Sequence, residues 1–326
     1  MTPIPTRTLS RQLAGVLLVA TVLATSHADE AARQWFENMG RAVEALNYRG
    51  TFVHTLHDQI ETMEVLHKSV DGHVFERMTS LTGPAREFIR NGEQIQCILQ
   101  ARKEVVVDLW QDQNPLMSSL PHYSDELSNY YQFELIEGSK RVAGRETVGI
   151  AIVPRDEYRY GYRLWLDRET AMPLLSDSVD RHGELIETLQ FTAIDFNPTF
   201  GENAFQSTLN TQDFNWIEPV GNVQSTRLSN TTWHAAEVPS GFSLSVSRIE
   251  DNGETRVEHH VYSDGLATVS VFAEPRAPGQ AVMRGATKLG VTNAFGRLEG
   301  DFQITVVGEV PPDTVKFIGN SFRPRK

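Results

Sequence analysis

The sequence predicts a mainly β (α+β) protein, with a large curved antiparallel sheet, a helix packed on it and a smaller α+β domain after it. Three observations support this fold class. Short segments of alternating apolar and polar residues recur between 48 and 196, separated by two-residue turn motifs. An amphipathic helix precedes them and needs an apolar surface to cover. The 298 residues that follow an expected 28-residue signal peptide also exceed what one compact core usually holds, so two domains are expected.

Residues 1–28 have the three parts of a secretory signal peptide. Arg7 and Arg11 give a positive start, and residues 13–24 form an apolar run that is too short to span a bilayer. Ser26-His27-Ala28 then places small side chains where a signal peptidase needs them, so cleavage is expected after Ala28. A buried helix or an uncleaved membrane anchor is the alternative interpretation of this segment.

The residue after the expected cleavage site is Asp29, whereas a bacterial lipoprotein needs a cysteine there for acylation. We therefore expect an exported, unlipidated protein that is free in solution. Removal of residues 1–28 moves the formal net charge from −12 to −14, because two arginines are lost. This charge argues against nucleic acid as a partner.

Cys97 is the only cysteine, which excludes an intramolecular disulfide. It alternates with Ile95 and Leu99, so we expect it to face inward from a strand as a small buried apolar residue.

The mature chain is expected to begin with a helix capped by Asp29 and to continue as a β domain over residues 29–205. Apolar side chains recur at helical spacing at Trp35, Phe36, Met39, Val43 and Leu46. Tight turns are expected at Asp71-Gly72, Asn91-Gly92 and His182-Gly183, and such short connections require antiparallel neighbours. The expected strands are 48–55, 62–70, 73–79, 85–90, 93–99, 104–108, 132–136, 146–153, 160–167, 173–179 and 184–196, forming one meander. Residues 111–128 are expected to form a loop with a short helix.

Residues 206–226 are polar and without a clean period, and are expected to be a linker to a C-terminal α+β domain over 227–326. Turn motifs at Asn252-Gly253 and Asp264-Gly265 separate expected strands in this domain. The strands are 242–250, 255–262, 266–273 and 302–307, with helices at 280–289 and from Pro311 to the end.

No motif for catalysis, metal binding or cofactor binding is found in the sequence. It lacks the G-x-S-x-G and glycine-rich phosphate motifs, and its histidines do not have the spacing of a zinc site. Carboxylate pairs that meet only in space stay open. We therefore expect a binding protein, not an enzyme, with no catalytic residue, no metal and no cofactor.

Aromatic residues are dense in the second half of the large sheet and alternate with arginines. The simplest interpretation is a packed core with solvated arginines outside it. The alternative is an apolar cavity with a basic rim, which would suit an amphiphile or an extended apolar peptide. The residues concerned are Tyr130, Tyr131, Phe133, Tyr158, Tyr160, Tyr162 and Trp165, with Lys140, Arg141, Arg145, Arg155, Arg159, Arg163 and Arg168.

The run RVAGRETVGIAIVPRDEYRYGYRLWLDRETAMPL (141–174) resembles the core of the periplasmic sigma-E regulators of the RseB/MucB family. Four further segments agree in order: LNYRGTF (46–52), GPAREFIRNGEQIQC (83–97), YSDGLATVSVF (262–272) and ITVVGEVPP (304–312). Together they are spread over nearly the whole mature chain.

The resemblance implies a large domain similar to the half-open barrel of the lipoprotein carriers LolA and LolB. It also implies binding to the periplasmic domain of a membrane anti-sigma factor of the RseA or MucA type, which is thereby shielded from site-1 proteolysis. A lipid or lipopolysaccharide ligand would trigger release. The family supplies no list of binding residues, and homo-oligomerisation stays open.

Two sets of candidate binding residues follow from these arguments. Because lipopolysaccharide is anionic, a site for it has to be locally basic. The ligand candidates are Tyr160, Tyr162, Trp165, Arg141, Arg159 and Arg163, and the partner candidates are Trp233, Tyr262 and Phe272. A periplasmic lipid or lipoprotein carrier of the LolA type is the alternative function, and the domain after residue 226 favours the regulator.

Overall fold

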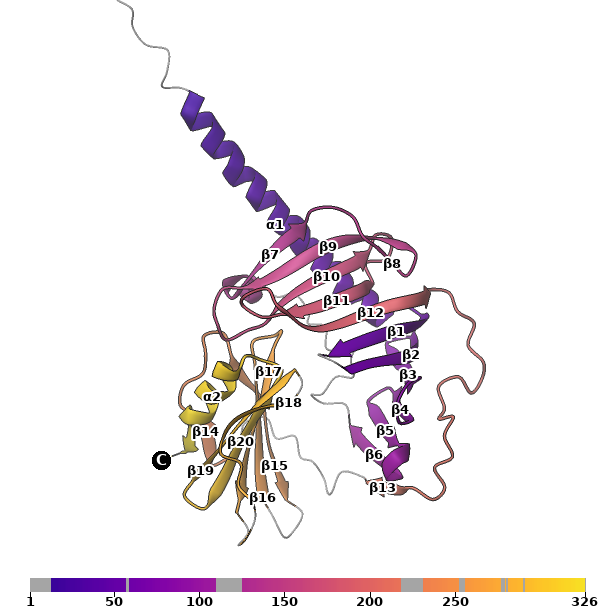
Figure 1. Cartoon of the computed structure of the whole chain (residues 1–326), viewed down its shortest axis with the longest axis vertical. Coiled ribbons are helices and arrows are strands. Elements are labelled where there is room, and N and C mark those ends of the chain that lie inside the picture. The colour runs from indigo at the N-terminus through magenta and orange to yellow at the C-terminus, as the bar shows by residue number, and fades with distance from the viewer. Residues whose placement is uncertain are drawn as a thin grey trace, which may run out of the picture.

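The computed structural model describes residues 13–56, 59–109, 125–217, 231–251, 256–276, 279, 281–289 and 291–325. A large curved sheet with a long helix across it forms the N-terminal domain, and a smaller sheet with a short helix forms the C-terminal domain (Figure 1). Among these residues no helix is both long and apolar enough to cross a membrane. The expected mainly β (α+β) fold class is confirmed.

Helix α1 (Leu13–Ala45) runs without a break through the expected cleavage site. Asp29 therefore lies inside this helix in the uncleaved chain, and its expected role as the N-cap of the mature chain stays a prediction. Its carboxylate accepts a hydrogen bond from Arg33 at 2.6 Å and one from the backbone N–H of Phe133 at 3.3 Å. The cleavage site itself stays a prediction.

The large sheet is antiparallel except at one edge, with the strand order β13-β6-β5-β4-β3-β2-β1-β12-β11-β10-β9-β7 and β8 paired to β9. Its two outer strands, β13 and β7, do not pair with each other, so the sheet is not closed into a barrel. The strands are β1 (Tyr48–Leu56), β2 (Gln59–Val70), β3 (His73–Ser80), β4 (Arg86–Asn91), β5 (Gln94–Leu99), β6 (Glu104–Leu109), β7 (Tyr131–Ile136), β8 (Arg141–Val142), β9 (Arg145–Pro154), β10 (Gly161–Asp167), β11 (Pro173–Val179), β12 (Leu185–Asp195) and β13 (Asn215–Ile217). Short 3-10 helices, η1 (Gln100–Arg102) and η2 (Asp125–Asn129), precede β6 and β7.

Every expected strand of this domain is present, but the expected single meander is wrong. The chain passes from β6 near one edge to β7 at the other, and the last long strand, β12, then pairs with β1 in the middle. Phe52 lies opposite Phe191 in this pairing. The expected loop over 111–128 lies mostly outside the described residues.

The predicted hairpin turns have the positive φ angles that tight two-residue turns require. Asp71 and Gly72 have φ of 52° and 79°, and Gly92 and Gly183 have φ of 62° and 79°. These left-handed conformations are the reason that glycine and aspartate occur there.

Helix α1 packs its predicted apolar face on the sheet. Phe36 and Met39 are buried in a cluster with Phe133 on β7, Ile150 on β9 and Leu164 on β10. Val43 joins a second buried cluster with residues of β1–β3 and β11–β12. The helix therefore ties the two halves of the sheet together along its length.

The segment after β12 covers the other face of β4–β6. Ser207 and Thr208 bind the fully buried carboxylate of Glu87, and Leu209 and Phe214 pack on an apolar cluster. Strand β13 then adds to β6 in parallel. The expected linker over 206–226 is therefore attached to the large sheet up to Ile217, and residues 218–230 lie outside the described part.

Because this segment buries the second face, Cys97 is not the inward residue of its strand. Ile98 is buried at 1% exposure against Ile89 and Val105, whereas Cys97 is half-buried. Partial burial raises the pKa of the Cys97 thiol, although the positive charge of Arg86 acts to lower it.

The C-terminal domain is a sheet with the order β15-β16-β17-β20-β19-β18, flanked by the pair β14-β21 and by helix α2. The apolar core under α2 (Pro312–Ser321) includes Trp233, Val269 and Phe322. The strands are β14 (Trp233–Ala235), β15 (Ser243–Asp251), β16 (Arg256–Ser263), β17 (Thr268–Pro275), β18 (Gly285–Leu289), β19 (Thr292–Glu299), β20 (Phe302–Gly308) and β21 (Phe322–Pro324). The turn expected at Asn252-Gly253 lies outside the described residues.

The helix expected over 280–289 is wrong. Gly285–Leu289 forms strand β18, paired to β19 at the edge of the sheet. Gly285 has a φ of 83°, a left-handed conformation that a helix interior does not accommodate.

Candidate functional site at the junction of the two domains

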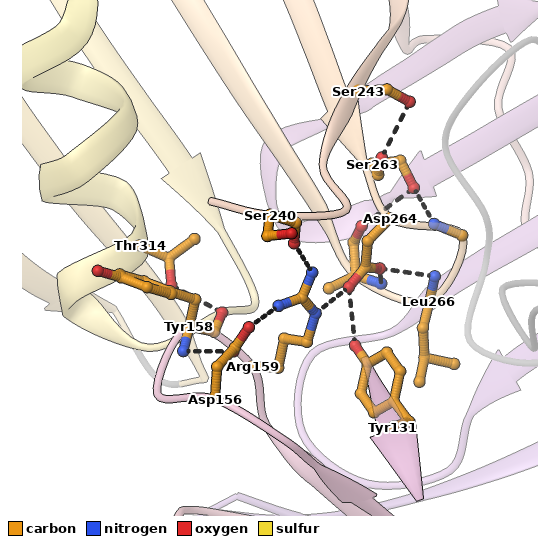
Figure 2. Close-up of polar contacts among 12 residues, drawn as sticks. Tyr131, Asp156, Tyr158, Arg159, Ser240, Ser243, Ser263, Asp264, Leu266 and Thr314 are labelled. Carbon is orange, nitrogen blue, oxygen red and sulfur yellow. Dashed lines mark hydrogen bonds and ion pairs between the residues drawn. The ribbon is translucent and has the colours of Figure 1, made fainter. Parts of the chain in front are cut away.

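The connection between β9 and β10, residues 155–160, meets the C-terminal domain (Figure 2). Asp156 turns the chain by accepting a hydrogen bond from the backbone N–H of Tyr158 at 3.0 Å. This turn directs Tyr158, Arg159 and Tyr160, three of the aromatic and basic residues noted in the sequence, toward the second domain.

Arg159 is the centre of the junction and has no solvent exposure. Its Nε donates to Asp264 at 2.5 Å, and its two terminal nitrogens donate to Asp156 and to the backbone oxygen of Ser240 (Figure 2). Its guanidinium carbon also lies 4.9 Å from the ring centroids of both Tyr130 and Phe242. Within the N-terminal domain Arg159 contacts Asp156, Tyr130 and, at 5.6 Å, the ring of Tyr131, whereas Asp264, Ser240 and Phe242 belong to the C-terminal domain.

Asp264 forms the other half of the junction and has a fully buried side chain. One carboxylate oxygen accepts hydrogen bonds from Arg159 and, at 3.0 Å, from the hydroxyl of Tyr131. The other accepts the backbone N–H groups of Leu266 and Ala267 at 2.9 and 2.7 Å, which hold the β16–β17 turn. Burial, followed by the charge of Asp264, raises the pKa of Tyr131, so this hydroxyl stays protonated and donates.

Two further contacts flank the ion pairs. The backbone oxygen of Tyr158 accepts a hydrogen bond from Thr314 at 2.7 Å, and its ring packs edge-on against Phe317 of α2 at 5.5 Å. The hydroxyl of Tyr160 accepts a hydrogen bond from Asn293 at 3.0 Å. Consecutive residues of one turn therefore contact four elements of the second domain.

Gly241 allows the two domains to approach this closely. Its φ is 89°, and a Cβ atom there would lie 2.6 Å from the Tyr130 ring and 2.8 Å from a guanidinium nitrogen of Arg159. A side chain at this position is thus excluded by both the backbone conformation and the space.

The six ligand candidates are not brought together. Arg159 and Tyr160 are buried in the junction, and Tyr162 packs with Leu164 in the cluster under α1. Trp165 belongs to a different cluster, and Lys140 lies 3.7 Å from the centroid of its ring. Arg141 and Arg163 are exposed. Arg159 therefore cannot belong to a basic rim in this arrangement, because acidic groups and the protein interior surround it.

Two of the three partner candidates lie in the core of the C-terminal domain. Trp233 stacks on Phe322 at 5.8 Å, and the hydroxyl of Tyr262 accepts the backbone N–H of Ala235 at 2.9 Å. Phe272 is half-buried and stacks on His259 at 4.2 Å. Of the three, Phe272 offers the most surface, and partner contact stays a prediction for all of them.

The described residues contain no group of three or more side chains that could hold a metal ion. A cavity of about 590 Å³ lies elsewhere, between β3–β5 and the segment 200–207, and is lined by Phe75, Phe200 and Phe205 together with amide side chains.

The sequence analysis did not identify Asp264 and Ser240 as functional residues. The turn at Asp264-Gly265 was expected from its sequence, but its pairing with Arg159 joins positions 105 residues apart. No local sequence pattern indicates a contact between such distant positions. The only sequence feature that pointed to this region was an arginine, Arg159, within a run of aromatic residues.

Comparison with known protein families identifies both domains of this chain. The profile of the MucB/RseB N-terminal domain matches residues 31–213, and that of the MucB/RseB C-terminal domain matches residues 227–323. The chain belongs to the MucB/RseB family.

Relatives and solved structures match both domains. The sigma factor AlgU regulatory protein MucB of Pseudomonas aeruginosa is 32% identical over 319 residues, covering 95% of this chain and 96% of that protein. The sigma-E factor regulatory protein RseB of Escherichia coli K12 is 28% identical over 310 residues, covering 92% and 93%. In the solved complex of Pseudomonas aeruginosa MucA and MucB, the matching chain has a TM-score of 0.70 at 30% identity, covering 91% of this chain and 99% of that chain. A crystal structure of MucB has a TM-score of 0.65 at 28% identity, covering 91% of this chain and 98% of that chain.

Proposed function

We propose that this protein is a periplasmic negative regulator of a sigma-E type envelope stress response. It binds the periplasmic domain of a membrane anti-sigma factor of the MucA or RseA type and shields that domain from site-1 proteolysis. The observation that carries the proposal is the match of both domains, at 30% identity and a TM-score of 0.70, to a MucB chain solved in complex with MucA.

The physical features of the chain support this role. Occluding a cleavage site requires only a stable bound surface, so no catalytic group is needed. A partner fixed in the membrane also removes any need for a membrane anchor on the regulator. The junction around Arg159 brings both domains together, so both can contribute to one partner surface.

Direct binding tests the proposal. The purified chain from Asp29 to Lys326 is titrated into a fluorescently labelled periplasmic segment of a MucA-type anti-sigma factor, and anisotropy is recorded. We expect saturable binding that an unlabelled segment competes away. Transfer of a labelled lipoprotein between membranes, without anti-sigma binding, would favour the carrier function instead.

We further propose that a lipid or lipopolysaccharide ligand triggers release. Tyr162 packs against the apolar cluster under α1, and the exposed Arg141 and Arg163 are available to an anionic head group. Replacing Tyr160, Tyr162 and Trp165 together by alanine is expected to weaken binding of lipopolysaccharide. Unchanged affinity in a variant that keeps its fold would contradict this assignment.

The proposed location has its own test. Mass spectrometry of the protein recovered from the periplasm should give the mass of residues 29–326 without acylation. A mass that includes residues 1–28 would contradict cleavage after Ala28.

A further inference from the structure

The contact between Arg159 and Asp264 has the properties of a reversible latch between the domains. Arg159 comes from the β9–β10 turn and Asp264 from the β16–β17 turn, and both side chains have 0% exposure. Asp156, at 29% side-chain exposure, is the partner of Arg159 within its own domain. Arg159 therefore keeps one carboxylate partner, Asp156, when the domains separate, and its charge is not left unpaired.

The energetics of this contact favour reversibility. Burying an ion pair costs desolvation that offsets much of the attraction between the charges, so such a pair adds geometric specificity more than net stability. When the junction opens, water rehydrates both charged groups, so neither is left buried and unpaired. The fork of the guanidinium sets one orientation, because its three nitrogens have separate acceptors on Asp156, Asp264 and Ser240.

The junction is also connected to the packing under α1. The buried Tyr131, which donates to Asp264, belongs to the same apolar cluster as Phe36 and Met39 of the helix. Leu266, two residues after Asp264, packs against this cluster from the second domain. The position of the second domain and the packing of the helix are thus coupled through shared side chains.

We propose that the Arg159–Asp264 contact is a latch that holds the two domains in the orientation that the anti-sigma partner binds, and that opening it lowers partner affinity. The part concerning affinity rests on the proposed function, whereas the latch itself does not. The latched orientation is the one in which the contacts of Arg159 with Asp264 and Ser240 hold the two domains together.

Small-angle X-ray scattering of the mature chain tests the latch without any partner. Arg159→Ala is expected to increase the maximum dimension, because the C-terminal domain is freed. Arg145→Ala is the control: Arg145 pairs with Asp167 at 2.5 Å and with Glu169 at 2.8 Å, all within the N-terminal domain, and its scattering should equal that of the wild type. Circular dichroism verifies that each variant is folded.

Gly241→Ala disturbs the same junction from the C-terminal domain, because the added Cβ would meet Tyr130 and Arg159. It serves as the second variant if Arg159→Ala does not fold. Its control is Gly138→Ala, because Gly138 has a similar φ of 94° but no atom within 4 Å of an added Cβ. Expansion in Gly241→Ala and not in Gly138→Ala supports the latch. Scattering that stays unchanged in the folded junction variants overturns it.

Partner affinity is then measured with the labelled periplasmic segment of a MucA-type anti-sigma factor. A drop of about tenfold in Arg159→Ala, within the usual range of coupling between sites, supports the regulatory part. An expanded variant with wild-type affinity overturns that part. If the wild type does not bind the segment at all, the proposed function fails, while the scattering result still decides the latch.

Discussion

Glu76 on β3 is a carboxylate whose burial opposes its charge. It is 3% exposed and lies opposite His67 of β2 and Arg90 of β4. Burial raises the pKa of Glu76 from 4.5 to about 7, although the charge of Arg90 acts in the opposite direction. The folded state therefore binds this proton more tightly than the unfolded chain does, and stability is lost as the pH rises from 4.5 through 7.

Glu76→Gln should remove that loss. We expect the variant to gain up to about 3 kcal/mol of unfolding free energy over the wild type at pH 8, and almost nothing at pH 5. Urea denaturation at both pH values measures the difference. The exposed Glu93→Gln is the control and should show no such dependence. An equal effect of Glu76→Gln at both pH values would contradict the assignment.

Glu258 on β16 is the opposite case. Burial alone would raise its pKa, but hydrogen bonds from His260, from the hydroxyl and backbone N–H of Thr232 and from the N–H of Trp233 lower it to about 2. Its charge therefore stabilises the C-terminal domain above pH 4.5, and that stability is lost as the pH falls toward 2.

Glu258→Gln should destabilise the protein at pH 7 by roughly 1–3 kcal/mol, because an amide replaces a charged acceptor of several hydrogen bonds. The deficit should shrink as the pH falls from 4.5 toward 2, because the unfolded wild type takes up a proton at Glu258 in this range while the folded wild type keeps the charge until about pH 2. Thermal unfolding at pH 7 and pH 3 provides the measurement, with the exposed Glu237→Gln as control. A deficit that is independent of pH would rule out this role of the charge.

The amphipathic pattern of α1 identified the side chains that pack on the sheet. Phe36 is 1% exposed in the cluster with β7, β9 and β10, and its ring lies 5.4 Å from that of Phe133. Phe36→Ala should lower the unfolding free energy by about 3–5 kcal/mol, through lost burial and a cavity between the helix and the sheet. Chemical denaturation measures this loss. Gln34→Ala, on the exposed side of the helix, should change stability little, and equal losses in both variants would contradict the packing.

Elements were predictable where their causes are local. The spacing of Phe36, Met39 and Val43 defines a helix face, and Asp71-Gly72 or Gly92 requires a turn with positive φ. The pairing of β1 with β12 was not predictable, because it joins positions about 140 residues apart. The helix expected over 280–289 was wrong, because Gly285–Leu289 is an edge strand whose pairing with β19 no local pattern reports.

The candidate site depends on contacts at the scale of the whole molecule, and the sequence revealed it only in part. Arg159 and Tyr160 were selected because they stand in a dense aromatic and basic run, and their surroundings were predicted as a ligand cavity. The structure places them against Asp264 and Asn293 of the second domain. A single sequence carries no signal that connects these positions, whereas the family resemblance did predict the fold and the family correctly.

We propose that this chain protects a membrane-bound anti-sigma factor by covering its site-1 cleavage site. The most direct test measures the rate at which site-1 protease cleaves the periplasmic segment of a MucA-type anti-sigma factor, with and without saturating mature chain. A control substrate of the same protease, lacking the anti-sigma segment, detects inhibition of the enzyme itself. We predict that cleavage of the anti-sigma segment slows at least tenfold while cleavage of the control substrate is unchanged, in keeping with a coupling of roughly 1–3 kcal/mol. Equal cleavage rates with and without the protein would contradict the account.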